Sequence, residues 1–245
     1  MHEFIHSLTR LLNHLFATPL VALLSSLGIH VAYPKAPIND TLTLELLVAF
    51  LMLLFFLVTR MTLNVEKPGT AQNLAEVVHE FVSNQADSII GHGYEPFVPY
   101  ATMIVVFVLS CNIVGLFPGL ETPTANPAVP LGIAIPTFFY YNWQGLRANG
   151  VVGYAKTFLG PIWAVSWLIG PIEIISNLAR VMSLTIRLYA NMFASDLLTL
   201  VFFSMIPIGL PVIFLGLHLF VAVIQAYVFL LLTLIYLSLA VAPEH

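Results

Sequence analysis

The chain has 245 residues, of which 59% are hydrophobic and only 8% are charged. This composition excludes an ordinary soluble domain and predicts a polytopic membrane protein built from α-helices. The net charge of −4 and the absence of any cluster of basic residues exclude a nucleic-acid partner.

Residues 1–40 are predicted to form an N-terminal extramembrane or interfacial arm. Residues 2–27 mix apolar side chains with Arg10 and three histidines, which makes the segment too broken to span a membrane. His2 and His6 have a spacing that can hold a metal ion, but nothing nearby supplies further ligands. The sequence therefore predicts neither a metal site nor a cofactor.

Residues 41–245 are predicted to form a single membrane domain with five membrane-crossing helices. The predicted spans are about 42–60, 97–117, 128–146, 172–206 and 211–242. Pro130 and Pro136 lie in the third span, which we expect to be kinked. Residues 72–90 have one apolar face, whereas Glu76, Glu80, Asn84 and Asp87 occupy the other. This pattern predicts an amphipathic helix that lies on the membrane surface.

The basic residues predict the orientation of these spans. Five crossings place Arg60, Lys67, Arg147 and Lys156 on one side of the membrane and Arg10 and Lys35 on the other. Because the side richer in Lys and Arg is usually cytoplasmic, we expect the N-terminus outside and the C-terminus in the cytoplasm.

The last two spans are longer than a membrane requires. As a straight helix, residues 172–206 would extend about 50 Å, whereas the hydrocarbon core is about 30 Å thick. No proline interrupts this segment, and Pro207 and Pro211 flank the turn that follows it. We therefore predict two long, strongly tilted helices that form a hairpin.

The first helix of this hairpin carries a polar stripe. At 100° per residue, one face holds Glu173, Ser176, Arg180, Ser183, Arg187 and Asn191, whereas Asp196 points to the opposite face. A charge at mid-membrane costs about 2.5–3.5 kcal/mol on insertion scales, so such residues are functional candidates. Arg187 stays protonated at any accessible pH, so it can block protons or attract a carboxylate but cannot relay protons. We expect Arg180 to be structural.

The second helix of the hairpin places His218 and Gln225 on one face, and we expect Gln225 opposite Arg187. Asp196 and His218 then lie at similar depth on the outer side, where a carboxylate and an imidazole can load protons as a pair. Glu173 lies toward the cytoplasm and can serve that side. His218 as a buried hydrogen-bonded histidine and Gln225 as a helix-to-helix contact stay open as structural alternatives.

Three separated motifs resemble subunit a of F-type ATP synthases across nearly the whole chain. They are the run IRLYANMFASD at residues 186–196, the run NIVGLFPG at residues 112–119, and the pair His218 and Gln225. The resemblance implies a stator subunit beside a rotating ring of c subunits, with a b-subunit peripheral stalk as a further partner. It also implies two offset aqueous half-channels, in an energy-transducing membrane such as a bacterial plasma membrane.

The resemblance also implies roles for six residues. Arg187 corresponds to the essential arginine, Asn191 to the neighbouring asparagine, Gln225 to the central glutamine, Asp196 and His218 to the outer acid and histidine, and Glu173 to the acid of the cytoplasmic path. Many members have Glu where this chain has Asp196. We therefore expect this shorter side chain to need a water or a slightly shifted His218 to complete the relay.

The predicted function is thus ion translocation rather than catalysis, because the chain has no P-loop or other nucleotide-binding motif. The carried ion can be a proton or Na⁺, since the coordinating groups would lie on the ring. The alternative is a self-contained secondary transporter or proton channel, which would need its own titratable group at mid-membrane. A purely structural assembly subunit would leave the polar stripe unexplained.

Overall fold

The computed structural model describes residues 2–26, 36–64, 68–117, 120–159, 166–205 and 210–242. Lys35, Lys67, Pro118, Gly119 and Pro207, which entered the sequence predictions, lie outside these ranges. The described elements are α1 (His2–Ser26), α2 (Asp40–Met61), α3 (Thr70–Ile90), η1 (Glu95–Phe97), α4 (Val98–Val114), η2 (Pro123–Ala125), α5 (Ala128–Leu159), α6 (Ser166–Met205) and α7 (Leu210–Val241). Within the described ranges every element is a helix, so the predicted all-α membrane fold is confirmed.

Five described helices are long and apolar enough to cross a membrane. These segments are Glu3–Ser26, Asp40–Met61, Glu95–Val114, Leu168–Met205 and Val212–Val241. Four of them coincide with predicted spans. The fifth lies in α1, within the predicted arm, whereas the predicted third span is the first part of α5, which is not among the five. The assignments of residues 1–40 to an arm and of 128–146 to a span stay predictions.

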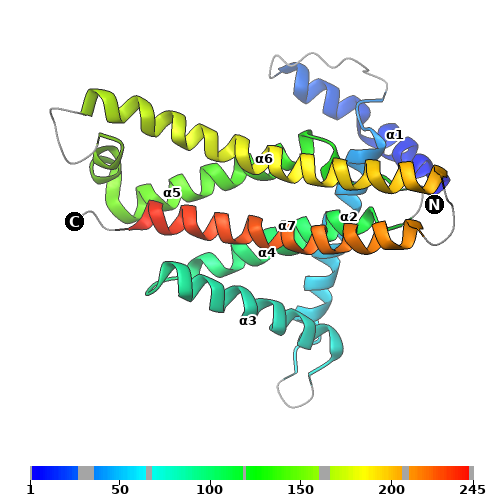
Figure 1. Cartoon of the computed structure of the whole chain (residues 1–245), viewed down its shortest axis with the longest axis horizontal. Coiled ribbons are helices and arrows are strands. Elements are labelled where there is room, and N and C mark those ends of the chain that lie inside the picture. The colour runs from blue at the N-terminus through cyan, green and yellow to red at the C-terminus, as the bar shows by residue number, and fades with distance from the viewer. Residues whose placement is uncertain are drawn as a thin grey trace.

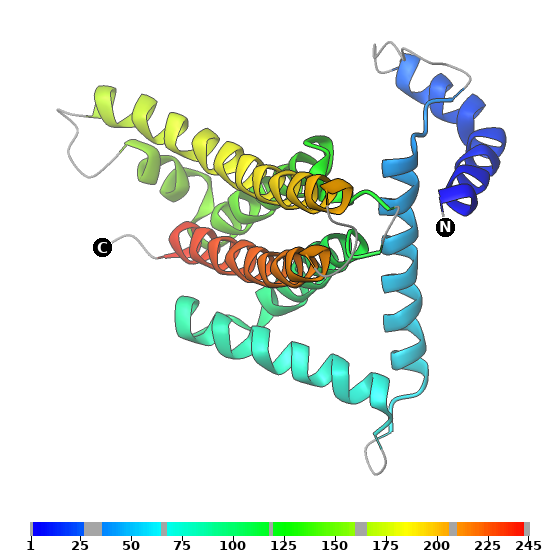
Figure 2. The same cartoon turned by 45° about the vertical axis from the view of Figure 1, so that its right-hand side comes forward.

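The predicted hairpin consists of α6 and α7, which run side by side in opposite directions (Figure 1). Helix α6 has 40 residues and α7 has 32. Helix α6 begins before the predicted span and includes Pro171, and from residue 172 to Met205 it continues without a break, as the lack of prolines in that segment predicted. Helix α2 stands across the direction of the hairpin (Figure 2). With 22 residues it is about 33 Å long, close to the hydrocarbon thickness. If α2 follows the membrane normal, α6 and α7 are strongly inclined.

Small residues allow α7 to approach its neighbouring helices closely. Ala222 and Ala226, one turn apart on α7, are 0% and 2% exposed. Gly145 of α5 lies against the Tyr154 ring and the backbone of α7. A Cβ atom at position 145 would clash with the ring and would lie only 2.9 Å from the carbonyl oxygen of Ala240. Close approach through small residues is the usual packing mode between helices in a membrane, where burial from water supplies little driving force.

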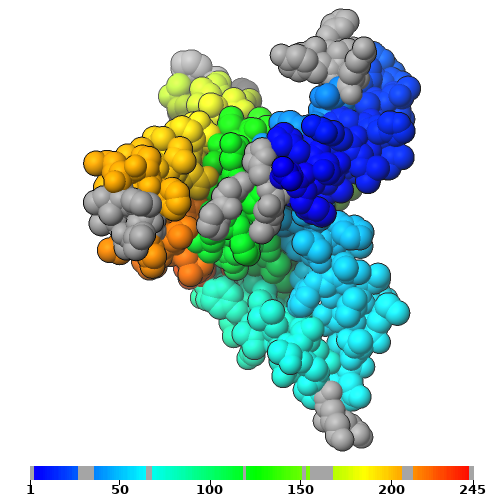
Figure 3. All heavy atoms as spheres, turned by 90° about the vertical axis from the view of Figure 1, so that its right-hand side faces the viewer, coloured from blue at the N-terminus to red at the C-terminus, as the bar shows by residue number. Residues whose placement is uncertain are grey.

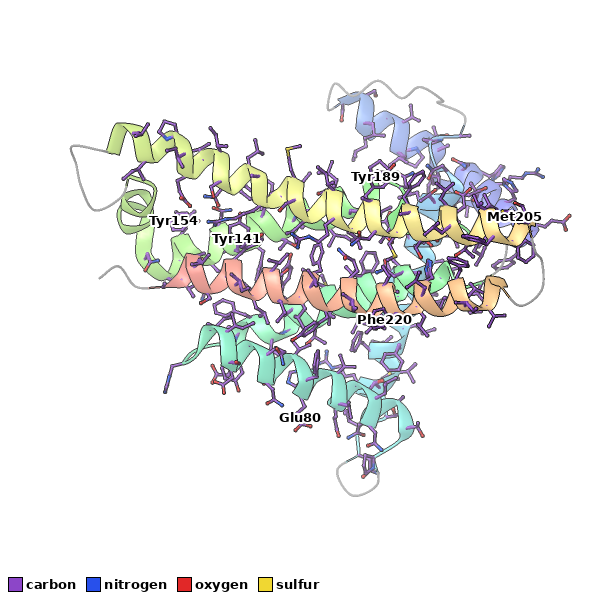
Figure 4. All side chains as sticks on the ribbon, in the orientation of Figure 1. Glu80, Tyr141, Tyr154, Tyr189, Met205 and Phe220 are labelled. Atoms are coloured by element: carbon purple, nitrogen blue, oxygen red, sulfur yellow. The ribbon has the colours of Figure 1, made fainter. Side chains whose placement is uncertain are left out.

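Helix α3 is amphipathic, as predicted, and its apolar face packs against α4 and α7. Val82 and Ala86 are fully buried there, whereas Glu80 points away from both helices (Figure 4). Its location at the membrane surface stays a prediction. In α5, the residue with non-helical backbone angles is Gly150, with φ 69° and ψ 169°, whereas Pro136 lies inside the helix. A positive φ is accessible to glycine because it has no Cβ atom.

In the direction of view of Figure 3, the C-terminal end of α6 and the N-terminal end of α7 lie on one side, and α1 and α2 lie on the other. Helices α1 and α2 therefore leave this part of the hairpin uncovered. Helix α6 exposes a series of large apolar side chains there and along its length: Ile175, Met182, Ile186, Phe193 and Leu197. An exposed apolar stripe of this length indicates contact with lipid or with another membrane protein.

Candidate functional site

A carboxylate and an imidazole meet between the two helices of the hairpin. The Oδ1 atom of Asp196 on α6 lies 3.3 Å from the Nδ1 atom of His218 on α7. The side chain of His218 is 1% exposed and that of Asp196 is 28% exposed. The predicted pairing of these two residues is therefore present in the structure. The aspartate reaches the ring directly, so neither a bridging water nor a displaced histidine is needed for contact.

The other contacts of His218 distinguish its two ring nitrogens. Its Nε2 atom lies 3.1 Å from the backbone carbonyl oxygen of Asn112, and its Nδ1 atom lies 3.0 Å from Oγ of Ser195. A carbonyl oxygen can only accept a hydrogen bond, so Nε2 carries a hydrogen atom. In the neutral ring Nδ1 is then the basic nitrogen, and it is the one that faces Asp196 and Ser195.

The loop between α4 and α5 completes this cluster around Asp196 and His218. Thr122 donates from its hydroxyl to Oδ1 of Asp196 at 2.9 Å and from its backbone N–H to Oδ2 at 3.4 Å. Thr124 donates to Oδ1 of Asn112 at 2.6 Å, and both side chains are fully buried. The sequence pattern did not single out Thr122 or Thr124 as site residues. The available signal was the uncharged Thr-Pro-Thr run at residues 122–124, which follows the predicted span 97–117 after four intervening residues.

A second contact joins the hairpin near its middle. Asn191 donates from Nδ2 to Oε1 of Gln225 at 2.9 Å, and Gln225 is 3% exposed. Gln225 was expected opposite Arg187, but its hydrogen-bond partner lies one turn further along α6. Arg187 is half-buried and makes no hydrogen bond or ion pair with any residue that the structure describes.

A cleft of about 290 Å³ connects these two parts of the site. Its lining residues are Asn191, Ala194, Ser195, Leu198, Leu217, Val221, Ile224 and Gln225. Asn191 and Gln225 line one end of the cleft. Ser195 lines the other end and contacts the buried imidazole of His218. Its walls are mainly apolar, and the amide groups of Asn191 and Gln225 and the hydroxyl of Ser195 supply the polar lining.

A separate polar cluster surrounds Glu173 near the start of α6. Its Oε1 atom lies 3.4 Å from Nη2 of Arg180 and accepts a hydrogen bond from Asn177 at 3.3 Å. Tyr141 of α5 donates to Asn177 at 3.2 Å, and the Arg180 guanidinium lies over the Tyr236 ring at 5.4 Å. These contacts agree with the structural role expected for Arg180. Asn177 was missed, although its spacing of four residues from Glu173 places both on one helix face.

The two clusters lie on either side of Arg187 along α6. Glu173 precedes Arg187 by 14 residues and Asp196 follows it by nine, which corresponds to axial distances of about 21 Å and about 14 Å. In Figure 4, Tyr141 of α5, which contacts the Glu173 cluster through Asn177, lies far from Met205 at the C-terminal end of α6.

The fold and these clusters define a polytopic helical membrane protein with titratable side chains held inside its helix bundle. A family model described as ATP synthase A chain matches residues 41–238. The chain is 52% identical over 97% of its length to ATP synthase subunit a of Koribacter versatilis, and the match covers 97% of that relative. It is 42% identical to the subunit of Solibacter usitatus, over 86% of this chain and 91% of the relative. The chain belongs to the ATP synthase subunit a family.

Family membership confirms the predicted class of function. The subunit is the F-type, proton-translocating stator component of the enzyme, and it is a non-catalytic part of the membrane sector. It therefore resides in a membrane and assembles with other membrane-sector subunits.

Proposed function

We propose that the chain provides two offset half-channels that load and unload a carboxylate on the c-subunit ring. The observation that carries this proposal is the position of Arg187, a half-buried arginine without a described partner between two separate polar clusters. The described hydrogen bonds form no chain from one cluster to the other. A proton would therefore have to leave the subunit at mid-membrane and travel on the ring.

In the outer half-channel, a proton from outside reaches Asp196, which is partly exposed, and passes to Nδ1 of His218. Ser195 adjoins the same nitrogen at 3.0 Å and also lines the cleft that ends at Asn191 and Gln225. Through that cleft the proton reaches the ring carboxylate. Once neutral, this carboxylate can move into lipid without the penalty that a charge would incur.

Arg187 separates loading from unloading. Its guanidinium cannot give up its proton, so it cannot carry protons from one half-channel to the other. It can instead attract an arriving ring carboxylate and favour the ionised form, because an opposite charge nearby stabilises that form. The absence of a described partner inside the chain leaves this charge available for the ring.

In the cytoplasmic half-channel, Glu173 accepts the released proton. Its side chain is 32% exposed, so it can exchange protons with water, while Arg180 and Asn177 hold its carboxylate in position. This release follows nearly one rotation of the ring, and from Glu173 the proton leaves on the cytoplasmic side.

The exposed apolar stripe of α6 supports the assignment of the ring as the facing partner. Ile186 and Asn191, which flank Arg187, are exposed on this helix. The further proposed partner is the b-subunit peripheral stalk. We place the complex in a bacterial plasma membrane, with the N-terminus outside and the C-terminus in the cytoplasm, as the basic residues predicted.

The test is the substitution Arg187→Ala in the assembled enzyme. Proton-driven ATP synthesis in vesicles is expected to be abolished, with normal assembly. The Arg187→Lys enzyme is expected to be severely impaired, because a compact ammonium group does not replace the planar guanidinium. Arg147→Ala, at an exposed arginine of α5, serves as the matched control. Near-normal synthesis by the Arg187→Ala enzyme would rule out the proposed role.

A further inference from the structure

One residue of the α4–α5 loop binds both oxygens of the Asp196 carboxylate. Thr122 is 1% exposed, and its hydroxyl and backbone N–H donate to Oδ1 and Oδ2 at 2.9 and 3.4 Å. The carboxylate belongs to a residue 74 positions later in the chain. Two hydrogen bonds, one to each oxygen, fix the orientation of the carboxylate plane, whereas a single hydrogen bond leaves the group free to rotate.

This contact determines which atoms the carboxylate presents to the imidazole. The oxygen that accepts from the Thr122 hydroxyl is the same Oδ1 that lies 3.3 Å from Nδ1 of His218. Asp196 is partly exposed, so without this restraint its side chain could rotate away from His218. We propose that Thr122 is a positioning residue that holds the Asp196 carboxylate against His218 for proton transfer, an inference that rests on the proposed function.

The surrounding residues keep Thr122 in place. Thr124, two residues later, bonds the side chain of Asn112, whose backbone carbonyl contacts Nε2 of His218. The loop and Asn112 therefore fix the carboxylate on one side and the ring on the other. The loop can approach α4 closely because residue 115 is a glycine. A Cβ atom there would overlap the Thr122 hydroxyl and would lie 3.1 Å from Cε1 of His218.

The test compares substitutions at Thr122 in the complete enzyme. ATP-driven proton pumping is measured in inverted vesicles and normalised to assembled complex. Thr122→Val keeps the size of the side chain but removes the hydroxyl, and it is expected to slow pumping about tenfold or more, as for a lost hydrogen bond to a charged group. Thr122→Ser restores the hydroxyl and is expected to stay within about twofold of the unmodified enzyme.

Thr102→Val is the matched control. Thr102 is a buried threonine of α4 whose hydroxyl has no hydrogen-bond partner among the described residues, so the same change there is expected to leave pumping unaffected. If Thr122→Val does not assemble, Thr122→Ala takes its place with the same expectations. Loss of assembly in both variants would overturn the proposal, because Thr122 would then be required for structure alone.

A second comparison connects Thr122 to the relay. In a His218→Ala background, Thr122→Val is expected to cause little additional loss of pumping, because the Asp196 carboxylate then has no imidazole against which it must be positioned. Full multiplication of the two losses, or a Thr122→Ser enzyme as slow as Thr122→Val, would contradict the positioning role. Normal pumping by Asp196→Ala and His218→Ala would instead contradict the proposed function itself. Impaired pumping in those two with normal pumping by Thr122→Val would overturn only this inference.

Discussion

Removing either partner of the Asp196–His218 contact is expected to slow proton translocation by about 10- to 100-fold. The two side chains are 3.3 Å apart, and a hydrogen bond with a charged partner contributes about 1.5–3 kcal/mol. Each 1.36 kcal/mol corresponds to about a tenfold change in rate. The Coulomb energy at this distance is about 5 kcal/mol with an effective dielectric constant of about 20. That value is an upper limit because Asp196 is partly exposed to water.

The double substitution distinguishes a pair from two independent residues. If the proton passes from one group to the other, Asp196→Ala combined with His218→Ala is expected to be little slower than either single variant. Exchanging the two residues is expected to recover only part of the activity. A carboxylate introduced at position 218 would face the Asn112 carbonyl oxygen, which can only accept hydrogen bonds.

The assay is ATP-driven proton pumping in inverted vesicles with matched amounts of assembled complex. Asp87→Ala and His92→Ala change an exposed aspartate and an exposed histidine away from the hairpin cluster, and they serve as controls. Fully multiplicative losses in the double variant, with no recovery after the exchange, would mean that the two residues act independently and would refute the relay.

Two further predictions concern the sidedness of the half-channels and the packing of the bundle. Cys111 is the single cysteine of the chain, so Cys111→Ser provides a cysteine-free background. In it, a cysteine replacing Asp196 is expected to react with aqueous reagents from outside, and one replacing Glu173 from the cytoplasm; identical sidedness would contradict two separate half-channels. Gly145→Ala is expected to lower the stability of the complex by about 1–3 kcal/mol, because its Cβ would lie 2.9 Å from a carbonyl oxygen of α7. Thermal inactivation measures this effect, and Gly132→Ala, which has open space, is the control; equal midpoints for both variants would show that the α5–α7 contact tolerates a methyl group.

Much of the fold could be predicted from the sequence because it depends on local patterns. Runs of apolar residues and the 3.6-residue period predicted the long helices, the amphipathic α3 and the unbroken α6. The contact between Asp196 and His218 was also predictable, since counting residues along two antiparallel helices gives their relative depth. Family membership followed from motifs that lie within single segments of the chain.

Tertiary structure decided the parts of the site that depend on how separate segments pack. Counting placed Gln225 opposite Arg187, but its hydrogen bond goes to Asn191, one turn further along α6. Counting gives approximate depth, whereas the packing of both helices decides which polar group on a face reaches its partner. The hydrogen bonds from Thr122 to Asp196 and from His218 to the Asn112 carbonyl span 74 and 106 positions. No periodic pattern records such contacts. The path of an irregular loop is determined by the cavity that the surrounding helices leave and by the polar groups that must find partners inside it.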